Sequence, residues 1–335
     1  MKIKPLFGVL ILTTLVGAYL YSCDVKLSTV KQHAIQTAIK SAGADFSARA
    51  EMQASFNPER DEKAREELGY VFATRAYLMG VTGLRLEEFR YGVSRMFALG
   101  ETFGLDRLSS VGEDGLSFNE FSYLKKLPSA QMKSGGSPNF DTLYGGVFYK
   151  VDEQPLTLTV PNTNGRFFNM QIIDAYMSNN GYIDATKDCE PCHYLIAGPK
   201  WQGKIPQGFT KIPVHHNEGF LAIRIRIDSV EEEPMVNALL SKFDAKPLNQ
   251  YLNDDDSHSR AAITEPQGVD GMDIFKRIVK IAHRNPPYSL ADKATWEDFK
   301  HIGMHLDKPF DPSSIDPAIK KGMLRAIDTV HDIVA

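Results

Sequence analysis

Six polar side chains that could bind a ligand or take part in catalysis lie in one stretch of the chain, residues 137–176. Apolar residues surround them, and a buried polar group is costly unless it is hydrogen-bonded or paired. The stretch therefore predicts a polar cluster that either stabilises a core or lines a pocket. Its members are Asn139, Asp141, Tyr144, Arg166, Gln171 and Asp174.

Two functions fit this cluster. A binding module would use it to hold a small polar or anionic ligand, or a partner sandwich domain, without chemistry. A hydrolase-like enzyme would use Asp141 or Asp174 as general base and Arg166 as a clamp for an oxyanion or carboxylate. We favour the binding module, because the sequence contains no nucleophile motif, phosphate-binding loop or dinucleotide-binding glycine pattern. We expect Asp141, Tyr144, Arg166 and Asp174 to meet around one concavity.

A second candidate site is the pentapeptide Cys189-Glu190-Pro191-Cys192-His193. Its C-x-x-C-H pattern is the attachment motif of c-type haem, for which His193 would be one axial ligand. The alternatives are a disulfide between Cys189 and Cys192 and a metal site or free thiols. We favour the disulfide and expect neither cofactor nor metal, because a strand begins directly after His193 and Pro191 separates the two cysteines. His215 and His216 precede a turn, and we expect them to be exposed.

The N-terminal segment predicts export. Lys2 and Lys4 precede an apolar run, Leu6–Leu20, which is the layout of a signal sequence. Leu20-Tyr21-Ser22-Cys23 follows and resembles a bacterial lipobox, in which Cys23 becomes the lipidated first residue. The alternative is an uncleaved signal anchor, since a spanning helix tolerates a run of about 17 residues. Both alternatives place the protein on the periplasmic or another extracytoplasmic face, tethered to a membrane.

Composition excludes a nucleic-acid-binding role. The 335-residue chain has a formal net charge of -4, and its positive and negative residues are interspersed. A nucleic-acid-binding protein carries a concentrated basic surface instead. The length allows two or three modules with cores of their own.

Strand-like segments dominate the middle of the chain. Leu143–Val151, Leu156–Val160 and Arg166–Asp174 are separated by turns, and we expect them to form an antiparallel meander. Gly219–Ile227 alternates strictly, which places Leu221, Ile223, Ile225 and Ile227 on one buried face. Short strands at close spacing with Gly and Pro turns favour a sandwich over a parallel sheet.

Helical patterns flank these strands on both sides. Asn57 and Pro58 begin a helix that runs to about Met79, and a second helix follows over Arg85–Leu99. The C-terminal third also shows helical spacing of apolar residues. The sequence therefore predicts an α+β protein with four parts: a signal or lipobox segment (1–23), a helical stalk and cap (24–105), an antiparallel β-sandwich (106–230) and a C-terminal helical module (231–335).

Several ordered motifs resemble a bacterial family known only as domain of unknown function 1254. They are the run SPNFDTLYGG from Ser137, the block Gly165-Arg166-Phe167-Phe168, and Ala197-Gly198-Pro199-Lys200-Trp201. The resemblance implies an Ig-like β-sandwich flanked by helices. Many relatives continue into a C-terminal jelly-roll domain, and this chain stops before it. A site shared by the two domains would then be completed by a separate jelly-roll partner protein.

Overall fold

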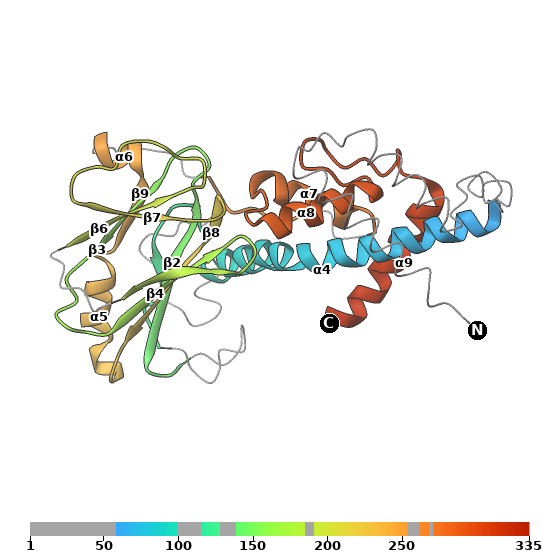
Figure 1. The fold of residues 1–335 in the computed structure, drawn as a ribbon. Helices are drawn as coiled ribbons and strands as arrows, with labels where there is room; N and C mark the ends of the chain where they lie inside the picture. The colour runs from blue at the N-terminus through green and yellow to red at the C-terminus, as the bar shows by residue number, and fades with distance from the viewer. Residues whose placement is uncertain are drawn as a thin grey trace, which may run out of the picture. The chain divides into compact units, whose positions relative to one another are not determined.

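The computed structural model describes residues 58–98, 115–127, 139–184, 191–253, 261–267 and 271–334. Residues Glu62–Ala335 form one compact unit. In this unit a β-sandwich and a group of helices share one long helix, α4 (Figure 1). The predicted α+β class is confirmed, with two mostly antiparallel sheets and helices before and after them in the sequence.

Within the described residues, nine strands form the two sheets of the sandwich. The first sheet is antiparallel and has the order β1 (Ser122–Tyr123), β2 (Thr142–Lys150), β8 (Glu218–Arg226), β4 (Phe168–Asp174) and β5 (Asn179–Asp184). The second has the order β7 (Phe209–Pro213), β6 (Cys192–Ala197), β3 (Leu156–Val160) and β9 (Asp244–Pro247). Within it, only the β6–β7 pair is parallel.

The predicted meander is wrong, although its strands are present. β2 and β4 do not pair with each other, because β8 lies between them and pairs with both. β3 belongs to the other sheet, where it pairs with β6 and β9. Local sequence marks each strand by its alternation, but it carries no information on which strand lies beside which.

The predicted inward face of β8 is confirmed. Leu221, Ile223 and Ile225 are almost completely buried in the core between the sheets, together with Ile227 directly after the strand. Burying each such side chain stabilises the fold by about 1.5–3 kcal/mol. β8 is the middle strand of the first sheet, and its alternating sequence correctly predicted which of its faces is buried.

The sandwich continues past residue 230, the end that we predicted. After the 3-10 turn η2 (Val230–Glu232), helix α5 (Glu233–Leu240) buries Val236 and Leu240 in the sandwich core. β9 then adds a strand to the second sheet. Its sequence, Asp-Ala-Lys-Pro, has no strand pattern, so this strand depends on its pairing with β3 rather than on local preference.

α4 is one helix of 41 residues, Pro58–Ala98, where we predicted two. The expected break falls at Gly80 and Gly83. A Cβ atom at Gly80 would overlap the side chain of Ile278 on α7 (Asp273–Arg284). The glycine thus serves close helix packing, which the sequence alone cannot distinguish from a helix break.

The remaining helices are α6 (Leu248–Asn253), α8 (Leu290–Phe299), η3 (Lys300–Ile302) and α9 (Pro317–Val334). α4, α7, α8 and α9 share a second core around Phe275, Trp296 and Phe299. α4 and α9 cross where Gly322 faces the backbone of α4. A glycine is needed there, because any Cβ would overlap the carbonyl of Glu66.

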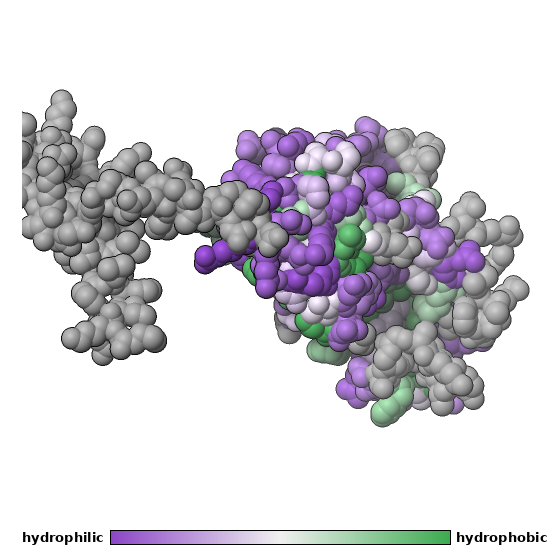
Figure 2. All heavy atoms as spheres, turned by 90° about the vertical axis from the view of Figure 1, so that its right-hand side faces the viewer, coloured by the Kyte–Doolittle hydropathy of each residue, from purple (hydrophilic) through white to green (hydrophobic). Residues whose placement is uncertain are grey.

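Hydrophilic residues cover most of the face in Figure 2, with small apolar areas between them. Among the described residues, no helix is both long and apolar enough to cross a bilayer.

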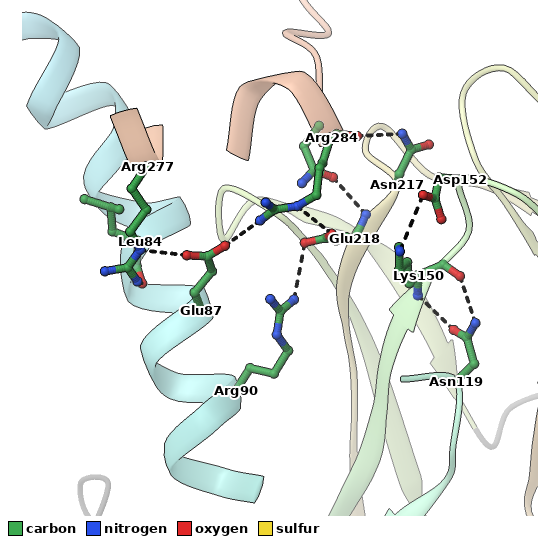
Figure 3. Close-up of polar contacts among 11 residues, drawn as sticks. Leu84, Glu87, Arg90, Asn119, Lys150, Asp152, Asn217, Glu218, Arg277 and Arg284 are labelled. Carbon is green, nitrogen blue, oxygen red and sulfur yellow. Dashed lines mark hydrogen bonds and ion pairs between the residues drawn. The ribbon is translucent and has the colours of Figure 1, made fainter. Parts of the chain in front are cut away.

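A buried ion network connects α4 and α7 to the start of β8 (Figure 3). Glu218 accepts hydrogen bonds from Arg90 Nη1 at 3.3 Å and from Arg284 Nε at 2.9 Å. Arg284 also bonds Glu87, whose other oxygen accepts from Arg277 Nε at 2.8 Å. Two carboxylates from different elements thus hold three guanidinium groups, in a region where unpaired charge is expensive.

Neutral hydrogen bonds reinforce the same junction. The Glu218 backbone N–H donates to Asn285 Oδ1 at 2.9 Å, and Asn217 Nδ2 donates to the Arg284 carbonyl at 2.6 Å. The Tyr176 hydroxyl donates to the Asn285 carbonyl at 3.1 Å. The C-terminal end of α7 is therefore fixed to the first sheet by side chains and backbone together.

Glu218→Gln tests the network. The substitution leaves Arg90 and Arg284 beside a neutral amide, so we expect the free energy of unfolding to fall by about 3–5 kcal/mol, measured by urea denaturation. Asp298→Asn is the control, because it removes an exposed pair with Arg75 at 3.0 Å and should cost about 1 kcal/mol or less. Equal losses in the two variants would show that the buried network does not hold the unit together.

Candidate functional site

The six predicted site residues do not meet at one place. Arg166 lies just before β4, and Asp174 is the last residue of that strand, so roughly 25 Å of strand separates them. Gln171 lies on the opposite face of β4 from Asp174, since burial alternates along the strand. The expectation of one shared concavity is wrong, because the spacing along a strand spreads these residues over both of its ends and faces.

Three of the six residues lie on or near the outer face of the first sheet. Tyr144 pairs with Arg224 across β2 and β8, and Arg224 Nη1 donates to Gln171 Oε1 at 3.3 Å. The backbone N–H of Asn139 donates to the Tyr144 hydroxyl at 2.8 Å. Asp141 is exposed, and its carbonyl accepts from the backbone of Ile227.

Asp174 instead forms a buried cluster. Its Oδ1 accepts from the backbone N–H groups of Tyr176 at 2.9 Å and Ser178 at 3.0 Å. Its Oδ2 accepts from Asn180 Nδ2 at 3.0 Å and lies 3.0 Å from His216 Nδ1. Both oxygens are therefore occupied by groups of the protein itself, which is the environment of a structural carboxylate rather than of a general base.

His216 was expected to be exposed, and that expectation is wrong. Its side chain is 8% exposed, packs edge-on against Tyr176 with ring centroids 4.8 Å apart, and faces Asp174. His215 is the more accessible of the two and stacks on Tyr288. His216 has the same parity as Arg226, on the face of β8 that points away from the sandwich core, so the alternation held no signal for its burial.

The pKa values of Asp174 and Tyr176 are shifted in opposite directions. Burial opposes ionisation of Asp174, but hydrogen bonds from His216 and Asn180 outweigh it, and the pKa of the carboxyl is lowered. Burial, followed by the negative charge of Asp174, raises the pKa of the Tyr176 hydroxyl. At neutral pH the cluster therefore holds an ionised carboxylate and a neutral phenol.

Asp174→Asn tests this electrostatic role. Because the folded-state pKa lies below the unfolded one, the ionised carboxylate contributes stability above the unfolded pKa of about 3.9, and this contribution is lost as pH falls through the folded pKa. We expect the variant to be about 2 kcal/mol less stable at pH 7, with a difference that shrinks below pH 4. Urea denaturation from pH 7 to pH 2 measures it, with exposed Asp328→Asn as the control for net charge. A difference that stays constant with pH would contradict the assignment.

Arg166 borders the cleft that we take as the candidate ligand site. The cleft has a volume of about 620 Å³, within the range of small-molecule pockets. It lies where the turn between β3 and β4, the end of β8 and helix α5 meet. Its lining consists of Asn162, Thr163, Asn164, Gly165, Arg166, Phe167, Arg226, Asp228, Met235, Ala238, Leu239 and Lys242.

The wall formed by residues 162–166 is shaped by a tight turn. The N–H of Arg166 donates to the Thr163 carbonyl at 3.0 Å, and the two residues between them have positive φ angles, 51° at Asn164 and 78° at Gly165. Asn and Gly are the residues that adopt these angles most easily. The Asn-Gly pair thus directs the chain so that Arg166 faces α5.

Arg166 fixes this wall to the start of α5. Its Nη1 donates to Glu232 Oε2 at 2.9 Å and to the Arg226 carbonyl at 2.9 Å. The hydrogen bond from Arg166 lowers the pKa of the Glu232 carboxyl. Arg166 is therefore a positioning residue of the cleft, and the clamp predicted for a ligand is engaged with the protein's own carboxylate.

Two further cations line the cleft and are more accessible. Arg226 Nε donates to Asp228 Oδ1 at 2.7 Å, with both side chains more than half exposed. Lys242 is exposed and forms no ion pair with any described residue. Beside these charges lie two exposed apolar side chains, Phe167 and Met235. The alternation of β8 had placed Arg226 on a face that is solvent-exposed or lines a pocket, whereas Lys242 and α5 were not predicted as site components.

The C-x-x-C-H segment lies only partly within the described residues. Cys192 begins β6, and the His193 ring lies beside Phe209 and Tyr251, with Nδ1 3.2 Å from Thr159 Oγ1. Cys189 and the lipobox residue Cys23 are outside the described residues, so the disulfide and the lipid anchor stay predictions. No group of three or more His, Cys, Asp or Glu residues arranged to hold a metal was found among the described residues.

Comparison with solved structures supports the fold alone. The VPA0106 protein from Vibrio parahaemolyticus matches with a TM-score of 0.57 at 18% sequence identity, covering 79% of this chain and 59% of that one. The chain thus spans less than two thirds of the length of that structure. An uncharacterised protein from Burkholderia cenocepacia matches with a TM-score of 0.29 at 12% identity, over 66% of this chain and 57% of that one. No curated protein matches this chain.

Comparison with protein families confirms the resemblance seen in the sequence. The match covers β1 to β9, the whole of the sandwich and the cleft that it forms with α5. Residues 118–247 thus match the DUF1254 family, described as a protein of unknown function.

Proposed function

We propose that this protein is a binding module that holds a small anionic or polar ligand in the cleft between residues 162–167 and α5. The observation that carries the proposal is the lining itself: three cationic side chains and only one carboxylate, Asp228, border a cleft of about 620 Å³. Such a cleft is large enough for an organic ligand. Most of its lining is polar or charged, and Phe167, Met235 and Leu239 add apolar surface beside the cations.

The enzyme alternative has weaker support. A general base must reach the substrate's proton directly or through one water. Asp174 is 1% exposed and bonded through both oxygens, and Asp141 does not line the cleft. Asp228 does line it, but this carboxylate is paired with Arg226. A binding function needs none of these groups to exchange a proton.

Binding of 1-anilinonaphthalene-8-sulfonate, an anion with an apolar body, tests the cleft. We expect saturable binding by the wild-type protein and an affinity at least about tenfold weaker in Met235→Glu, because the new carboxylate repels the probe and occupies the apolar part of the cleft. Fluorescence titration measures both. Leu324→Glu is the matched control, since it also replaces an exposed apolar residue on a helix, α9, outside the cleft.

The control should bind the dye as the wild type does, and circular dichroism should show all three proteins folded. Loss of affinity in both variants would assign the dye to another surface. Absence of saturable binding by the wild type would overturn the proposed binding function.

We also propose that the protein is exported and tethered to a membrane through lipid on Cys23, with the uncleaved anchor as the alternative. The support is the basic, apolar and lipobox-like order of residues 1–23. Cys23→Ser should move the protein from the membrane fraction to the soluble fraction, because acylation supplies the anchor. A full-length variant that stays in the membrane fraction would support the uncleaved anchor instead.

The remaining proposals concern covalent links and partners. We propose that Cys189 and Cys192 form a disulfide and carry no haem or other cofactor, for which thiol titration and the visible spectrum are the measurements. A separate jelly-roll protein is the partner that the family resemblance implies. Co-purification with such a protein would support it, and a purified chain that binds its ligand alone would argue against it.

A further inference from the structure

We propose that the ligand of the cleft is a monocarboxylate with an apolar chain, whose carboxylate lies between Arg226 and Lys242. This inference rests on the proposed function and names the class of ligand. It depends on three features of the cleft: its balance of charge, the donors that Arg226 offers, and the position of the apolar side chains.

The balance of charge favours a single negative charge on the ligand. Arg166 is paired with Glu232 at 2.9 Å, and Arg226 with Asp228 at 2.7 Å. Lys242 lines the cleft and forms no ion pair with a residue that the structure describes. One positive charge is therefore left to be neutralised. A monoanion matches it, whereas a dianion would leave an excess negative charge beside two carboxylates.

The donors of Arg226 favour a carboxylate as the carrier of this charge. Asp228 accepts from Nε of the guanidinium, and neither terminal Nη group has a hydrogen bond to another described residue. A pair of Nη donors matches the two oxygens of a carboxylate in a bidentate arrangement. The ammonium group of Lys242 adds a third donor that needs no fixed geometry.

The apolar residues define the rest of the ligand. Phe167 and Met235 line the cleft with 58% and 53% of their surfaces exposed, and Leu239 packs on the sandwich core beneath it. An inorganic ion would leave this surface in contact with water. A ligand with an apolar chain would cover it, with a gain of about 25 cal/mol for each Å².

Displacement of the bound dye tests the class of ligand with four probes that share an eight-carbon chain: octanoate, octyl phosphate, octylamine and 1-octanol. We expect octanoate to displace the dye at concentrations about tenfold lower than octanol or octylamine, and severalfold lower than octyl phosphate, which carries nearly two charges at pH 7. Lys242→Gln and Arg226→Gln should each reduce the preference for octanoate over octanol about tenfold. Lys293→Gln, an exposed lysine on α8, should leave it unchanged.

The outcomes separate this inference from the proposed function. If the dye binds the cleft and octanol or octyl phosphate displaces it as well as octanoate, the carboxylate assignment is overturned and the binding function stands. If octanoate keeps its preference in both glutamine variants, Arg226 and Lys242 are not the carboxylate site. If the dye does not bind the cleft at all, both the proposed function and the inference fail.

Discussion

The hydrogen bonds that Glu218 makes with Arg90 and Arg284 are the contact on which the arrangement of this molecule depends. Glu218 is the first residue of β8, whereas the two arginines come from α4 and α7. Displacing the buried Glu218 carboxylate from its two guanidinium partners is costly, because it leaves a charge unpaired away from water. The network therefore specifies how the helices meet the first sheet, while the apolar cores supply most of the stability.

β8 runs from this junction to the cleft beside α5. The strand begins at Glu218 in the ion network and ends at Arg226 in the lining of the cleft, with its core face buried throughout. Every residue of β8 is also held by β2 on one side, and most of them by β4 on the other. A site at the end of such a strand is held in position by the sheet, and this is the rigidity that a preformed binding site needs.

The two charged regions of the sandwich differ in what their charges can do. Around Asp174 and Glu218 the ionised groups are buried and mutually satisfied, so they stabilise one structure. In the cleft Arg226 and Lys242 are exposed, and we propose that they bind the ligand. The same residue types thus have a structural role where water is excluded, and the proposed binding role falls where water can be displaced.

The sequence by itself determined the local features: the core face of β8, the positions of β3 and β4 within two residues, the helices on both sides, and the DUF1254 resemblance. Only the tertiary structure decided which strands pair, that Gly80 packs within one helix, that His216 is buried, and that Arg166 faces Glu232 rather than Asp174. The reason is that alternation and helical spacing record which side of a segment is buried. The partner of a charge or a strand can lie far away along the chain, 197 residues for Glu87 and Arg284 and 259 for Glu66 and Arg325. It is selected by the packing of the whole unit.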